Sequence, residues 1–126
     1  MTHRAEFVAE WARAIADTSY VSLSAAQLEV FAGGLTDTLV TLLDAPAYDA
    51  AAARRIGEAM IAAHCTGADT LQRTVVLLHT VGGLSLPQIS EMLGKRLAAV
   101  KSLHRRGLAA AARALEAASN VSAVEP

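Results

Sequence analysis

Residues 84–115 read LSLPQISEMLGKRLAAVKSLHRRGLAAAARAL, and this stretch decides the fold. A short segment with apolar residues at helical spacing precedes Gly94, and a longer segment rich in alanine and leucine follows it. Glycine accepts the positive φ that a tight turn between two helices requires. Six lysines and arginines follow this glycine, and no acidic residue lies between Glu91 and Glu116. The pattern predicts a helix-turn-helix whose second helix is basic.

The first helix of this unit has a clear start signal. Ser85 and Gln88 have the spacing of a capping box, and Pro87 falls in the first turn, where its missing N–H costs nothing. The two glycines at positions 82 and 83 are expected to end the preceding helix. Ser90 is the small residue expected where the two helices cross. The apolar residues expected to pack across the turn are Ile89, Leu93, Leu97, Val100 and Leu103.

The remaining sequence predicts an all-α protein. Hydrophobic residues make up 53% of the chain but aromatics only 4%, because much of the apolar content is alanine, a strong helix former. No long alternating run of β-branched residues indicates a sheet. We expect a helical bundle of about four helices followed by, or merged with, the C-terminal helix-turn-helix. The predicted helices cover residues 3–17, 25–45, 50–64, 68–81, 86–93 and 96–118.

Local signals place the first residues of the earlier helices. Ser24 with Gln27 predicts a capping box, and so does Thr66 with Asp69, whereas Asp49 alone is expected to cap the third helix. Each of these side chains can accept a hydrogen bond from a free N–H of the first helical turn. N-caps are therefore predicted for the three helices that cover residues 25–45, 50–64 and 68–81.

The first two helices contain a tryptophan and a glycine pair whose roles need separate interpretation. Phe7, Trp11 and Ile15 lie four residues apart on one face of the first helix, so we interpret Trp11 as a core residue and not as a ligand-stacking one. Gly33 and Gly34 lie inside the second helix, where each should cost about 1 kcal/mol relative to alanine. We expect a neighbouring helix to approach closely at these glycines.

Charge divides the chain into segments. Residues 1–66 carry four arginines and eight acids, a net charge of −4, whereas residues 67–126 carry a net charge of +3. The asymmetry indicates an acidic helical body and a basic C-terminal unit. We therefore divide the chain into an acidic helical body at 1–66, a helix-turn-helix at 67–118 and a disordered tail at 119–126.

Several function classes receive no support from the sequence. No carboxylate pair, nucleophile with base, or phosphate-binding loop has fitting spacing, so an enzyme is not expected. No cofactor is indicated, and the neighbouring His64 and Cys65 lack further ligands for a metal. With a single cysteine, no signal peptide pattern and no apolar run of 18 residues, we expect a cytoplasmic protein without a membrane span.

Residues 72–115 resemble region 4 of sigma-70-type factors, especially the extracytoplasmic-function group. LuxR-type regulators share parts of the same pattern. The resembling residues run without a gap and are Arg73, Val75, Leu77-Leu78, Gly83-Leu84-Ser85, Gln88-Ile89-Ser90, Leu93-Gly94, Ala99-Val100-Lys101-Ser102-Leu103 and Arg106-Gly107-Leu108.

This resemblance implies a DNA-binding transcription regulator or sigma-factor-like module whose last helix enters the major groove of double-stranded DNA. In the family this unit reads the −35 promoter element and contacts RNA polymerase, which is the second implied partner. Two departures concern base reading: Ala98-Ala99 replaces the family's usual Gly-Thr, and Lys95-Arg96 stands where a capping residue is usual. The implied DNA-binding residues are Lys95, Arg96, Ala98, Lys101, Ser102, Arg105 and Arg106.

A second resemblance covers residues 7–80, which are similar to the helical N-terminal region of some actinobacterial diguanylate cyclase and phosphodiesterase proteins. It implies the alternative function, a non-enzymatic regulatory or dimerisation domain of a cyclic-di-GMP signalling type protein, because no catalytic motif of those proteins is present. A homodimer through the N-terminal helices is the corresponding partner. The residues that carry this resemblance are Phe7, Trp11, Thr18-Ser19-Tyr20-Val21, Leu35, Gly57 and the segment 64–71.

Overall fold

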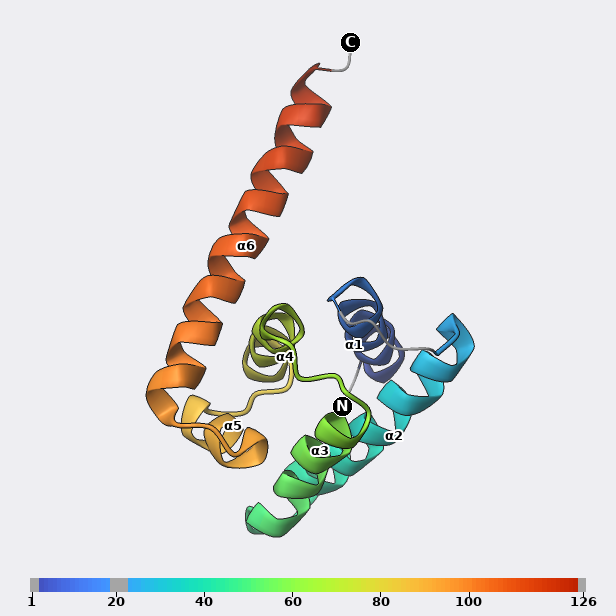
Figure 1. Ribbon diagram of the computed structural model, residues 1–126, viewed down its shortest axis with the longest axis vertical. Coiled ribbons are helices and arrows are strands. Elements are labelled where there is room, and N and C mark those ends of the chain that lie inside the picture. Colours follow the sequence, from blue (N-terminus) through green and yellow to red (C-terminus); the bar gives the residue numbers. More distant parts are fainter. Residues whose placement is uncertain (1–2, 19–22, 125–126) are drawn as a thin grey trace.

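The computed structural model describes residues 3–18 and 23–124, with the backbone alone given for 120–124. These residues form helices and connecting loops without a β-strand, so the predicted all-α class is confirmed. Residues 19–21, which contributed to the second resemblance, lie outside the described ranges. Figure 1 shows the helices, which are α1 (Arg4–Thr18), α2 (Ala25–Asp44), α3 (Ala50–Ala62), α4 (Ala68–Thr80), α5 (Leu86–Leu93) and α6 (Leu97–Val124).

Side-chain caps explain where three of the helices begin, namely α2, α3 and α5. Ser24 and Ser85 each form the predicted capping box, with Gln27 and Gln88 respectively, and the Asp49 carboxylate accepts from two N–H groups at the start of α3. The box predicted at Thr66 is wrong, because α4 starts one residue later than that box requires. Its N-cap residue is Gly67, which has no side chain to accept a hydrogen bond.

The last helix is longer than predicted. α6 continues to Val124, whereas the sequence predicted a helix end near residue 118 and a disordered tail from 119. The segment 116–124 contains three alanines and no glycine or proline, so it lacks the residues that most strongly terminate a helix. Among the residues described, no helix combines the length and the apolar character that crossing a membrane would require.

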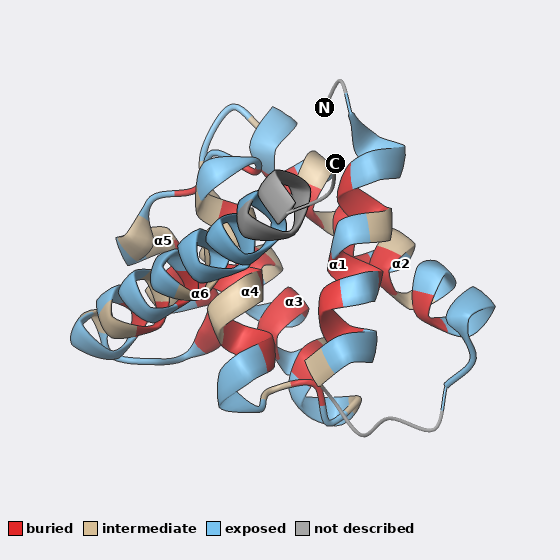
Figure 2. Ribbon diagram, turned by 90° about the horizontal axis from the view of Figure 1, so that it is seen from above, coloured by how far each residue is buried: buried red, intermediate tan, exposed pale blue. Residues whose placement is uncertain are grey.

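One apolar core runs through all six helices. Trp11 is fully buried in it, as predicted, and its ring meets that of Phe7 edge to face at a centroid distance of 5.6 Å. α1 packs against α2 and α4, α3 packs against α2 and α5, and α6 packs against α4 and α5. Figure 2 shows the buried residues on the faces between helices, whereas most of α6 is exposed. Apolar contacts therefore cross the predicted boundary at residue 66.

Two glycines allow helices to approach closely, and they are not the predicted pair. A Cβ on Gly57 of α3 would lie 2.1 Å from the Met92 carbonyl oxygen of α5, and one on Gly107 of α6 would lie 2.7 Å from the carbonyl oxygen of Gln72. A Cβ on Gly34 would meet nothing within 4 Å, and one on Gly33 only an arginine side chain. The close approach predicted at residues 33 and 34 is therefore wrong.

Candidate nucleic-acid interface

The turn between α5 and α6 depends on a left-handed glycine and a serine hydroxyl. Gly94 has φ 63° and ψ 32°, and its N–H lies 3.3 Å from the carbonyl oxygen of Glu91. The Lys95 N–H donates to the Ser90 carbonyl at 3.1 Å, which closes the C-terminal turn of α5. In addition, the Ser90 hydroxyl donates to the Lys95 carbonyl oxygen. Ser90 thus fixes the turn as well as filling the crossing point, a role that the sequence did not predict.

The two helices pack through the residues that the sequence pattern predicted. Ile89 and Val100 are fully buried, and Leu93 and Leu103 are nearly so. Leu97, at the start of α6, is half-buried. Figure 1 shows α6 turning steeply away from α5 and continuing past the rest of the molecule. The short turn and the buried apolar pairs are the defining features of a helix-turn-helix.

The predicted DNA-binding residues lie on the side of α6 that faces away from the core. At about 100° per residue, Val100, Leu103 and Gly107 share one side of the helix, against α4 and α5. The predicted contacts within α6 cover the opposite arc, roughly 140° wide at this rotation. Of the seven predicted residues, Ser102 is half-buried and the other six are exposed, namely Lys95, Arg96, Ala98, Lys101, Arg105 and Arg106.

Most cations on this surface are free of protein anions. Among the described residues, no ion pair involves the side chains of Lys95, Arg96, Lys101 or Arg105. The Arg106 guanidinium donates to the Ser102 hydroxyl at 3.0 Å, which holds it along the helix surface. Cations without intramolecular partners can neutralise phosphates without first breaking an ion pair.

The N-terminal body supports α5 from behind. The Tyr48 hydroxyl donates to the Gln88 carbonyl at 3.2 Å, and the Arg54 guanidinium lies 3.8 Å from the Glu91 carboxylate. Burial, with a smaller contribution from Glu91, raises the pKa of the Tyr48 phenol, so it remains a hydrogen-bond donor at neutral pH. Arg54 also offsets the one acid near the turn, which would otherwise repel a phosphate.

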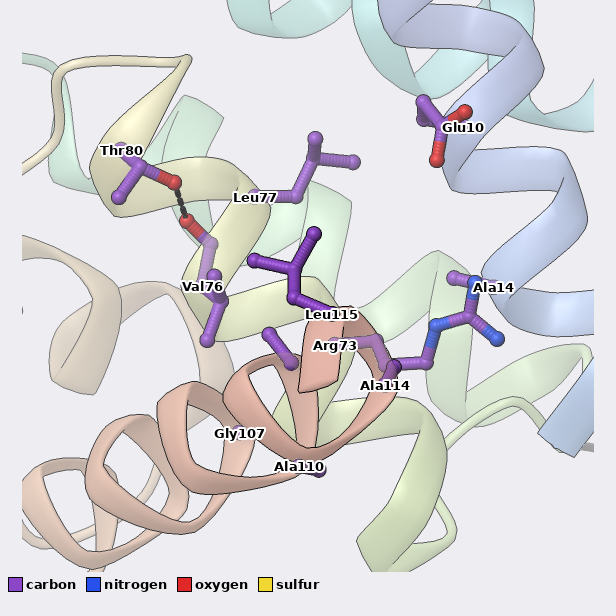
Figure 3. A pocket seen from close by; sticks show the side chains of 11 residues that line it. Glu10, Ala14, Arg73, Val76, Leu77, Thr80, Gly107, Ala110, Ala114 and Leu115 are labelled. Atoms are coloured by element: carbon purple, nitrogen blue, oxygen red, sulfur yellow. Dashed lines mark hydrogen bonds between the residues drawn. The ribbon is translucent and has the colours of Figure 1, made fainter. Parts of the chain in front are cut away.

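An apolar groove lies on the other side of α6, between α1, α4 and the C-terminal half of α6, with a volume of about 590 Å³. Figure 3 shows Val76, Leu77 and Leu115 along it, with Glu10 and Arg73 at its α1 side. Both charged groups already have partners, because Arg73 pairs with Asp17 and Glu10 with Arg13. Both ionisable side chains recorded along the groove are therefore engaged in ion pairs. Within the described residues, no cluster of three or more His, Cys, Asp or Glu side chains could hold a metal ion.

The turn, the buried crossing and the outward basic helix define a helix-turn-helix of the DNA-binding class. Residues 69–110, a third of the chain, match the family model of Sigma-70, region 4, which confirms the resemblance predicted for residues 72–115. No curated protein and no solved structure matches the chain. The matched family is a DNA-binding, non-enzymatic unit of transcription, and the match covers all of α5, the turn and the first half of α6.

Proposed function

We propose that this protein is a sigma-factor-like transcription regulator that inserts the first half of α6 into the major groove of double-stranded DNA. The observation that carries the proposal is the exposed face of α6, where cations without intramolecular ion pairs lie opposite the buried side. An α-helix has the diameter that the major groove admits.

The seven residues divide by chemistry into two groups. Lys101, Arg105 and Arg106, together with Lys95 and Arg96 at the turn, are suited to phosphates, because a cation gains affinity there whatever the base sequence. Ala98 is exposed and Ser102 half-buried, and both lie among these cations on the arc of α6 that faces away from the core. A methyl group can contact the thymine methyl and a hydroxyl can bond a base edge, so these two residues are the proposed base-reading positions.

Direct binding to a random-sequence duplex tests the proposal. The full chain should increase the fluorescence anisotropy of a labelled duplex at about 50 mM salt, where phosphate contacts are strong. Arg105→Glu should weaken this binding strongly, because it places an anion against the phosphates. Arg55→Glu is the matched control, since Arg55 is exposed on α3 and outside the proposed interface. No duplex binding by the unmodified chain, or equal losses in both variants, would overturn the proposal.

RNA polymerase is the second proposed partner, on the strength of the region 4 match alone. Co-elution of the full chain with purified core polymerase in size-exclusion chromatography tests it. The same column, run with the chain alone, tests the homodimer proposed through the N-terminal helices, where Val30 of α2 is 78% exposed. A monomer whose size does not change with concentration would remove the dimer proposal, and separate elution from polymerase would remove the other.

A further inference from the structure

Two imidazoles meet at the junction of the three C-terminal helices, beneath the proposed DNA-binding surface. His79 of α4 and His104 of α6 have ring centroids 4.8 Å apart, with their planes at 83°. The Leu84 carbonyl oxygen, just before α5, lies 2.7 Å from Nδ1 of His79. A carbonyl only accepts, so Nδ1 of His79 carries a proton and donates it. The pair therefore connects α4, the start of α5 and α6.

His104 has an unusual polar atom. Its Nε2 is buried and has no hydrogen-bond partner. An unpartnered buried nitrogen is tolerated at moderate cost when the ring is neutral, but a charged ring without a partner costs far more. The site therefore favours the neutral form of this imidazole.

In the part of the chain that the structure describes, no anion contacts either histidine ring. The charged side chains on the three helices are Asp69 and Arg73 on α4, Glu91 on α5, and Lys101, Arg105, Arg106, Arg113 and Glu116 on α6. Among the described residues, none of them forms an ion pair or a hydrogen bond with either ring, and Glu91 is engaged with Arg54. Burial first, and the neighbouring His79 second, lower the pKa of His104.

We propose that the His79–His104 pair is a pH-sensitive contact that holds α6 in its DNA-binding position only while the His104 ring is neutral. Proton uptake by His104 introduces a cation without a partner at the α4–α6 contact and loosens α6 from α4. The part of this inference that concerns DNA rests on the proposed function, whereas the loosening of α6 does not.

The sign of the DNA effect distinguishes this mechanism from ordinary electrostatics. Added positive charge on a DNA-binding protein normally increases its affinity for phosphates, so acidification should strengthen binding. Loosening of α6 acts in the opposite direction, because the basic residues no longer share a fixed face. We therefore expect duplex affinity to fall several-fold between about pH 7 and about pH 5, because the lowered pKa of His104 places proton uptake below the ordinary histidine value of about 6.5.

Hydrogen exchange tests the structural part without DNA. In the full chain, α6 amides should lose protection at the lower pH, after correction for intrinsic exchange, while α2 amides should not. The double variant H79N/H104F should keep α6 protected at both values. Its asparagine amide can still donate to the Leu84 carbonyl, and its phenylalanine keeps an aromatic ring without an unpartnered nitrogen. His3→Gln, at an exposed histidine just before α1 that contacts Glu6, is the matched control and should behave as the unmodified protein.

Titration of the imidazole carbon resonances in the unmodified chain keeps the proposal testable if the double variant fails to fold. His104 should titrate below the ordinary histidine pKa of about 6.5. Titration of His104 at or above that value, or α6 protection that does not change with pH, would overturn the proposal. Loosening of α6 without any duplex binding at either pH would instead overturn the proposed function and leave the histidine pair standing as a conformational switch.

Discussion

At the scale of single residues, glycines set how closely the helices pack. Gly57 and Gly107 both lie on buried faces where a neighbouring backbone carbonyl occupies the space of a Cβ. The sequence suggested Gly33 and Gly34 instead, because a glycine pair inside a helix is conspicuous. A lone glycine in an alanine-rich helix carries no such signal. Whether a glycine is required depends on which backbone lies opposite, and that information belongs to the tertiary fold.

Gly57→Ala should destabilise the protein by about 1–3 kcal/mol, because the added methyl forces α3 and α5 apart. Gly34→Ala is the matched control, because Gly34 also lies in a helix and nothing lies within 4 Å of the Cβ that alanine would add. It should stabilise the protein by up to about 1 kcal/mol through helix propensity. Urea unfolding followed by circular dichroism measures both changes, and equal effects of the two substitutions would refute the role of Gly57.

At the scale of elements, the start and end of α5 were predictable because their signals are local. The Ser85–Gln88 box and the Gly94 turn each depend on residues a few positions apart, and both form as predicted. The first half of α6 was predictable from its periodicity for the same reason. The hydrogen bond of the Ser90 hydroxyl across the turn was not predictable. The sequence pattern requires only a small residue at that position, and serine meets this requirement without any hydrogen bond.

Gly94→Val should disrupt the turn, because a β-branched residue is strongly disfavoured at the observed φ of 63°. We expect a loss of a few kcal/mol of stability and of the fixed position of α6. Gly94→Asn should be tolerated much better, since asparagine visits the left-handed region more readily. Thermal melts and amide spectra of the two variants provide the comparison, and indistinguishable behaviour would contradict the assigned turn.

At the scale of the whole molecule, the acidic body and the basic unit share one core. α1 packs on α4, α3 packs on α5, and Tyr48 and Arg54 reach α5 from the body. Charge asymmetry predicted the two segments but not their contacts, because net charge says nothing of which apolar faces meet. The division of the chain at residue 66 therefore remains a proposal that rests on charge alone. Because the two segments share a core, we expect them to unfold together.

Trp11 makes this expectation measurable. It is the only tryptophan and is buried in α1, so its fluorescence reports on the body, whereas far-ultraviolet circular dichroism reports on every helix. The two signals should follow one coincident urea transition, as a single cooperative unit requires. Helical signal that persists after the fluorescence transition would show that the C-terminal unit is stable without the body.

The most direct test of the central claim, that the outer face of α6 binds DNA, is the salt dependence of duplex affinity. Each phosphate contact contributes about 0.9 to the slope of log affinity against log salt concentration. Lys101→Ala and Arg105→Ala should each lower the magnitude of that slope by about 1, whereas Arg55→Ala should leave it unchanged. Slopes that are the same in all four proteins would contradict the assignment of this face of α6 to DNA.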